Sequence, residues 1–275
     1  MALAQKLTVM PSRNNNARPG NAPADSVPGP KADERSHPVL KPRPAGTLLI
    51  LDKRDGRPHV LMGRRHKAHT FMPGVFVFPG GRVDRPDNHA PYNADLTDAT
   101  MARLMASGQA SLATDRRARA FALAAIRETY EEAGMLIGRS ASTPIVTSNT
   151  LWKPFLGHGQ LPDLAALRYV ARAVTPPGLV RRYDTRFFTV SRAAISAQLP
   201  DSPTNELSDL TWVPFDRVAK ERWICRITWP CRSILCDMAS AGVFSSRPPR
   251  DTTIAIIHQP CAVLSFYRLR ALCTA

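Results

Sequence analysis

The sequence lacks the marks of several protein classes. Its 275 residues contain no apolar run of about 18 or more, so a membrane protein is not expected. None of the five cysteines belongs to a C-x-x-C pair, which argues against a structural zinc site. The start, MALAQKLTVM, has no apolar core of a secretory signal. With the odd cysteine count this predicts reduced thiols and a cytoplasmic location, while the lack of acidic residues before Asp25 leaves a transit peptide open.

Acidic residues are scarce relative to basic ones. The 22 Asp and Glu against 37 Lys and Arg give a net charge of +15. This excess favours anionic partners, either phosphorylated small molecules or nucleic acid. Because the arginines are spread along the chain and form no long block, nucleic acid is not favoured as a partner. The alternative is that the basic residues only keep the surface soluble.

The first part of the chain differs in composition from the rest. Residues 1–43 are rich in Pro, Asn and Gly without sustained apolar periodicity, which predicts a disordered tail. Residues 44–275 are expected to form one domain. Strands are predicted at 45–51, 59–62, 75–78, 167–173, 186–190, 210–214, 254–257 and 263–267, and helices at 98–107, 115–133 and 226–241. Asp55-Gly56 predicts a hairpin turn, and Pro79-Gly80-Gly81 a loop. The mixture, without a regular βαβ alternation, favours an α+β or α/β sandwich.

The clearest predicted helix is 115–133. Thr114 or Asp115 can cap its start, and Gly134 can end it. Its second half carries Glu128, Glu131 and Glu132.

These three glutamates fall within about 100° of arc on one face of the helix. Like charges at this spacing repel by roughly 0.2–0.5 kcal/mol per exposed pair, and the helix dipole adds to the cost. A divalent cation would remove the repulsion, and carboxylate oxygens suit Mg²⁺ or Mn²⁺. A solvated acidic face is the alternative explanation for such a cluster taken alone.

The surrounding sequence resembles the Nudix hydrolases, whose motif is G-x5-E-x7-R-E-U-x-E-E-x-G-U, where U is a bulky aliphatic residue. Gly81 and Asp87 match its opening, with Asp in place of Glu. Residues 127–135 match its second half, with Thr129 in the first aliphatic position. The halves are separated by 39 residues, from 88 to 126, where the family has seven, so we interpret residues 88–113 as an insertion. The match extends to segments resembling later strands of an insertion-bearing bacterial branch, which is similar to a mammalian peroxisomal coenzyme A diphosphatase: 175–177, 182–188 and 206–214.

The resemblance implies a Nudix fold, in which helices sandwich a mixed β-sheet, and it implies roles for the acidic residues. The three glutamates of the helix would hold Mg²⁺ or Mn²⁺, and Glu131 or Glu132 would also act as the base for a water. Glu206 is a candidate further ligand or base, or else a surface residue. Arg127 would pair with Asp84 or Asp87 and brace the loop.

Substrate-binding candidates lie upstream of the helix. Gly80 and Gly81 would let the backbone approach a phosphate, although a plain turn explains each as well. Arg82, the next residue, is also expected to bind the substrate. Arg65 lies where a coenzyme A-type motif places an arginine ahead of its G-x3-F-P-G-G segment, while Thr70 stands where that motif has a second arginine.

These features predict a metal-dependent hydrolase of the diphosphate linkage in a nucleoside diphosphate derivative. Coenzyme A or acyl-CoA is the first substrate, with ADP-ribose or a dinucleotide next. The alternative is a non-catalytic Nudix-fold module that senses a nucleotide or binds nucleic acid; the intact glutamates argue against it, and the charge of +15 for it. A homodimer is left open. The insertion would form either a lid or an inert surface excursion.

Overall fold

A computed structural model describes residues 40–66, 74–107, 114–175, 177, 181–220 and 256–257. The predicted tail lies outside them apart from residues 40–43, of which Arg43 already begins the first strand. The helix predicted at 226–241 and the strand at 263–267 also lie outside. Within the described ranges, no helix is long and apolar enough to cross a membrane.

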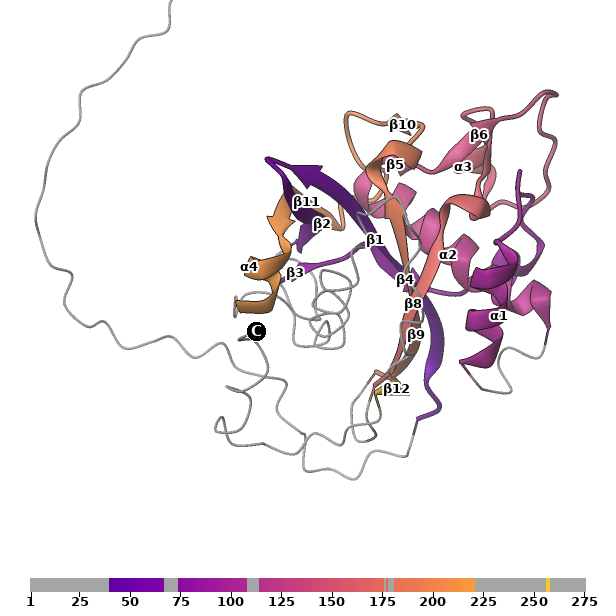
Figure 1. The fold of residues 1–275 in the computed structure, drawn as a ribbon. Helices are drawn as coiled ribbons and strands as arrows, with labels where there is room; N and C mark the ends of the chain where they lie inside the picture. The colour runs from indigo at the N-terminus through magenta and orange to yellow at the C-terminus, as the bar shows by residue number, and fades with distance from the viewer. Residues whose placement is uncertain are drawn as a thin grey trace, which may run out of the picture. The chain divides into compact units, whose positions relative to one another are not determined.

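A mixed β-sheet forms the centre of the fold (Figure 1). Its strands follow the order β11-β2-β1-β9-β8-β12, with β3 paired to β2 and β4 paired to β1. They are β1 (Arg43–Arg54), β2 (Arg57–Arg65), β3 (Phe76–Val77), β4 (Gly80–Arg82), β8 (Arg168–Val174), β9 (Tyr183–Ser191), β11 (Leu207–Pro214) and β12 (Ile256–Ile257). Strand β1 runs antiparallel to β2 and β4 and parallel to β9. The predicted mixed α+β architecture is confirmed.

The central strand β1 is buried on both faces, which explains its continuous apolar run. Leu48 and Ile50 belong to the hydrophobic cluster on the helix-covered face, whereas Leu49 and Leu51 belong to the cluster on the other face. The strand ends in the predicted two-residue turn. Asp55 (φ 50°) and the glycine after it (φ 75°) both have positive φ, as a type I′ hairpin requires.

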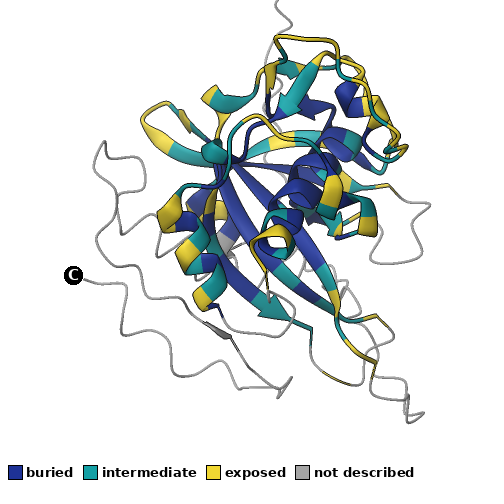
Figure 2. Ribbon diagram, turned by 90° about the vertical axis from the view of Figure 1, so that its right-hand side faces the viewer, coloured by how far each residue is buried: buried dark blue, intermediate teal, exposed yellow. Residues whose placement is uncertain are grey.

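The helices and smaller strands complete the fold. The helices are α1 (Asp98–Ala106), α2 (Asp115–Ala133), α3 (Lys153–Leu156) and α4 (Phe215–Lys220), with 3₁₀ turns η1 (Arg85–His89), η3 (Leu164–Ala166) and η4 (Arg192–Ala194). Two further strand pairs are β5 (Met135–Leu136) with β10 (Ala197–Gln198), and β6 (Gly138–Ser140) with β7 (Gln160–Pro162). Helix α2 packs on β1 and β4, and most of its length is buried (Figure 2).

The prediction of a loop at 79–81 is wrong for two of its three residues. Gly80 and Gly81 belong to strand β4, which pairs with β1. A Cβ at Gly80 would lie 2.6 Å from the Gly46 carbonyl oxygen, so the missing side chain permits this close approach of strands. The strand predicted at 75–78 shortens to the two residues of β3 for the same reason: the chain leaves β2 to join β1.

The described part of the insertion, 88–107, packs into the hydrophobic core. Leu96 and Leu104 are buried in the cluster under α2, and helix α1 packs on α2 and β8. Thr100 Oγ1 also donates to the Leu167 carbonyl at 3.4 Å. Neither a lid nor an inert excursion describes this part of the chain, and residues 108–113 lie outside the described ranges.

The ends of α2 are those predicted. Thr114 Oγ1 accepts from the Arg117 amide at 3.2 Å, which satisfies one of the free N–H groups of the first turn. At the other end Gly134 has φ 65°, and its amide donates to the Tyr130 carbonyl at 2.9 Å.

Replacing Gly134, the residue that ends α2, should lower the stability of the protein. Gly134→Ala is expected to reduce the free energy of unfolding by about 1–2 kcal/mol, because an L-residue is strained at positive φ. The added Cβ would also lie 3.2 Å from the Asp201 carbonyl oxygen. Urea denaturation measures the loss. Gly134→Asn, which tolerates this conformation better, should lose less; equal losses in the two variants would contradict the explanation.

Candidate active site

A buried ion pair joins η1 to α2. Arg127 Nε donates to Asp87 Oδ1 at 3.0 Å, and its Nη2 donates to Oδ2 at 3.2 Å. The carboxylate of Asp87 also accepts from the Trp152 indole N–H at 2.9 Å and from the Asp84 amide at 2.8 Å. Four donors therefore hold an acidic side chain that is fully buried.

The other edge of the Arg127 guanidinium faces the glutamates. Its Nη1 donates to Glu128 Oε1 at 2.9 Å and to Glu131 Oε2 at 3.0 Å, and its Nη2 donates to the Arg82 carbonyl at 2.9 Å. Burial lowers the pKa of Arg127, but the hydrogen bonds to Asp87 and the glutamate charges raise it by more, so the group stays charged. One arginine thus ties η1, β4 and α2 together.

Glu132, the third glutamate, points to β4. Its Oε2 accepts from the Gly80 amide at 2.9 Å. Burial raises the pKa of Glu132 to about 8, and the charge of Glu128 contributes to the rise. Burial also raises the pKa of Glu128 to about 7, in spite of the neighbouring Arg127, and raises the pKa of Glu131.

Gly81 lets the glutamate face approach the strand. A Cβ at this position would lie 2.4 Å from the Glu128 carboxyl carbon. A side chain here would displace the Glu128 carboxylate from its place against β4. Gly81 therefore leaves room for the Glu128 carboxylate, whereas Gly80 leaves room for β1.

Arg65 of β2 and Glu206, the residue directly before β11, act electrostatically on the glutamates of α2. The charge of Glu206 raises the pKa of both Glu131 and Glu132, and the charge of Arg65 lowers that of Glu132. The loop before Glu206 is tied to α2, because the Thr204 amide and hydroxyl donate to the Glu131 carbonyl at 3.1 and 2.8 Å. Among the described residues, Arg65 Nε is buried without a hydrogen-bond partner.

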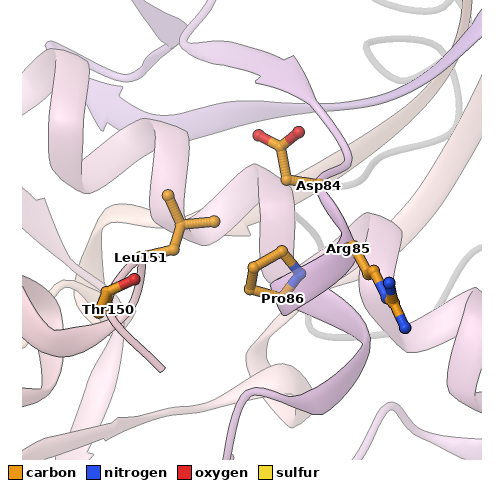
Figure 3. Close-up of a pocket in the computed structure, with 5 residues that line it drawn as sticks. All are labelled: Asp84, Arg85, Pro86, Thr150 and Leu151. Atoms are coloured by element: carbon orange, nitrogen blue, oxygen red, sulfur yellow. The ribbon is translucent and has the colours of Figure 1, made fainter. Parts of the chain in front are cut away.

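Two hollows adjoin this group of side chains. A cleft of about 720 Å³ is lined by Glu128, Arg82 and Asp84 among others, and Arg82 Nε lies 2.8 Å from Asp84 Oδ1. A shallower groove of about 530 Å³ lies on the far side of Asp84, where Pro86 and Leu151 face each other and Arg85 points away (Figure 3). Only the first hollow contains a glutamate of α2.

The structure therefore brings the predicted site residues together around the second half of α2. It adds Trp152, which no local pattern indicated, since it reaches Asp87 from 65 positions away.

The donor chemistry at this site is that of a hard cation site. Within the described ranges, no three His, Cys, Asp or Glu side chains converge on one point. Instead a guanidinium, itself a cation, lies between Glu128 and Glu131. The possible metal ligands here are carboxylate oxygens, and the charges of Glu128, Glu131 and Glu206 each raise the pKa of a neighbouring glutamate. These residues fit Mg²⁺ or Mn²⁺ by donor type and by the repulsion that a cation would relieve.

The chain is similar in sequence to curated proteins. The chain is 30% identical to acyl-coenzyme A diphosphatase NUDT19 of Gallus gallus, with 47% of each chain covered. It is 27% identical to putative nudix hydrolase 7 of Caenorhabditis elegans, over 62% of this chain and 51% of that protein. The chain thus spans about half the length of these curated relatives.

A solved structure is similar as well. The crystal structure of a NUDIX hydrolase from Alicyclobacillus acidocaldarius matches with a TM-score of 0.51 and 27% identity, covering 73% of this chain and 92% of that one. No family model matches the chain.

Proposed function

We propose that the chain is a member of the Nudix family and a pyrophosphohydrolase that cleaves the diphosphate linkage of a nucleotide derivative, on the strength of its similarity to Nudix hydrolases. One observation carries the proposal. Glu128, Glu131 and Glu132 are gathered beside the Gly80-Gly81 strand and braced from behind by Arg127, although their mutual repulsion costs stability. A fold without a charged ligand has no need of such an arrangement.

The three glutamates of α2, together with Glu206, would hold the Mg²⁺ or Mn²⁺ that this chemistry uses. When bound, the cation would neutralise phosphate charge and lower the pKa of a water. Arg127 fixes the direction of Glu128 and Glu131, and the Gly80 amide fixes that of Glu132. Glu131 or Glu132 would accept the proton of the attacking water.

The phosphates of the substrate would lie against β4 and the end of β2. Arg65 has a buried Nε without a partner among the described residues, so it can donate to a phosphate oxygen. Arg82 lines the cleft beside Glu128. Gly80 and Gly81 add no side chain to this surface, and the Gly80 amide itself already donates to Glu132.

Coenzyme A or an acyl derivative is the first substrate we propose, because a relative is named an acyl-coenzyme A diphosphatase. ADP-ribose and dinucleotides come next, since they contain the same diphosphate linkage.

A substrate panel tests the proposal directly. Coenzyme A, acyl-CoA, ADP-ribose, NADH and a diadenosine polyphosphate are incubated with the protein and Mg²⁺ or Mn²⁺, and the released phosphate esters are separated by chromatography. At least one compound should be cleaved, and Glu131→Gln should abolish the cleavage. Asp55→Asn, which neutralises an exposed carboxylate at the hairpin turn, is the matched control and should leave it unchanged. Tight nucleotide binding without turnover of any compound would instead establish a non-catalytic sensing module.

A further inference from the structure

A concentration of basic residues surrounds the cleft next to Glu128. Its positively charged lining residues are Lys41, Arg43, Arg82, Arg181 and Arg182. Against these five stand two acidic ones, Asp84 and Glu128. The cleft is therefore electropositive directly beside the glutamates of α2.

The basic residues come from strand ends that the sheet places side by side. Arg43 at the start of β1 is in register with Tyr183 of β9, and Ala45 of β1 is in register with Arg82 of β4. Residues far apart in the sequence thus meet at one edge of the sheet. Strand pairing fixes the positions of Arg43 and Arg82, while Lys41, Arg181 and Arg182 directly precede β1 and β9.

Arg182 holds this edge together. Its Nε donates to the Thr175 carbonyl at 3.0 Å and its Nη1 donates to the Leu40 carbonyl at 2.5 Å. The Arg43 amide in turn donates to the Arg182 carbonyl at 2.9 Å. Since its guanidinium already binds two backbone carbonyls, Arg182 braces the segment before β1 against β9.

The remaining cations have no such task. Arg82 is paired with Asp84 at 2.8 Å. The exposed side chains of Lys41, Arg43 and Arg181 form no ion pair with any residue in the described part of the chain. Three positive charges around one cleft, without ion-pair partners within the described ranges, repel each other, and an anion placed between them would remove that repulsion.

We infer that this cleft binds a second phosphate of the substrate, a phosphate monoester distinct from the diphosphate that is cleaved. The inference rests on the proposed function. Glu128 lines the same cleft, so one molecule can place its diphosphate at α2 and its monoester between Arg43 and Arg181. Arginine forks bind phosphate oxygens in pairs, which suits a doubly charged terminal group. The substrate class is a nucleoside diphosphate derivative with an additional phosphate on its ribose.

Matched compounds that differ by one phosphate monoester test this. kcat/KM is measured for coenzyme A against 3′-dephospho-coenzyme A, and for NADPH against NADH. The wild type should favour the phosphorylated member of the pair it cleaves by about tenfold or more, as expected for a charge-assisted contact. In Arg43→Ala and Arg181→Ala this ratio should fall towards one. Arg57→Ala, at an exposed arginine beside the hairpin turn, is the control and should keep the wild-type ratio.

The outcomes separate the subsite from the activity. Cleavage of both members of a pair at equal kcat/KM, lost in Glu131→Gln, would overturn the second-phosphate subsite and leave the proposed function standing. If no compound is cleaved, calorimetry decides the subsite alone. Adenosine 3′,5′-bisphosphate should then bind about tenfold more tightly than AMP, and Arg43→Ala should remove that difference. Equal affinities would reject the subsite.

Discussion

Replacing Asp87 with alanine is expected to cost about 3–5 kcal/mol of unfolding free energy, the range for breaking a buried ion pair. The Asp87 side chain is 0% exposed and that of its partner Arg127 is 3% exposed. The substitution leaves a buried guanidinium without its main counter-charge. It also leaves the Trp152 indole N–H and the Asp84 amide without their acceptor. Thermal unfolding measures the loss, which should appear as a decrease in Tm of roughly 6–20 °C.

Asp95→Ala provides the matched control. Asp95 also binds an arginine through both oxygens, with Arg119 Nε at 2.8 and 2.9 Å, but its side chain is 39% exposed. Removing this exposed pair should cost at most about 1 kcal/mol. Trp152→Phe should lose an amount of unfolding free energy between those of the two variants, since it removes one hydrogen-bond donor to Asp87 and keeps the other three. Equal losses in the Asp87 and Asp95 variants would show that the buried pair does not stabilise the fold.

The parts of the fold that the sequence predicted are those fixed by local chemistry. The hairpin at Asp55 follows from a two-residue turn that needs positive φ, and the bounds of α2 follow from Thr114 and Gly134 at its ends. The glutamate face follows from helical periodicity alone. Each of these signals lies within a few residues of the structure it determines.

The parts that the sequence did not predict depend on contacts between distant segments. The parallel pairing of β1 with β9 joins Arg43 to Tyr183, and no local pattern indicates it. Strand β4 was predicted as a loop because glycines favour turns. In the structure its glycines let β4 approach β1 on one side and Glu128 of α2 on the other. The basic cleft is of the same kind, since the pairing of β1 with β4 and β9 brings Arg43, Arg82 and the residues before β9 together.

In the acidic cluster, too, local sequence predicts some features and contacts between distant segments determine the others. Its three carboxylates could be placed on one helix face from their spacing. Their partners could not, because Arg127 might have pointed to solvent, and only the packing of η1 against α2 turns it between Asp87 and the glutamates. The Gly80 amide that binds Glu132 comes from a strand 52 residues earlier.

Divalent cations and pH are expected to change stability together. Without a cation, burial raises the pKa of Glu132 to about 8 and that of Glu128 to about 7. In the unfolded chain both carboxyl groups have pKa values of about 4.3. Between these values the folded protein binds more protons than the unfolded chain, so the free energy of unfolding in EDTA should fall as pH rises from about 4.3 to about 8.

Mg²⁺ or Mn²⁺ should reverse this trend, because it binds the ionised carboxylates of the folded state. At a free concentration about 100 times its Kd, the cation would add about 2.7 kcal/mol of unfolding free energy. Thermal unfolding from pH 5 to pH 9, in EDTA or with cation, should show a rise in Tm that is small at pH 5 and grows up to about pH 8.

Glu132→Gln separates this effect from other consequences of pH. Its amide oxygen can still accept from the Gly80 N–H, but the buried group no longer ionises. At pH 8 the variant should be more stable than the wild type in EDTA and should gain much less from the cation. Asp55→Asn, an exposed carboxylate at the turn, should behave as the wild type does. A cation-induced shift in Tm that is equal at pH 5 and pH 8, or unchanged in Glu132→Gln, would mean that the cation binds elsewhere. The loss of stability caused by burying these glutamates would then need another explanation.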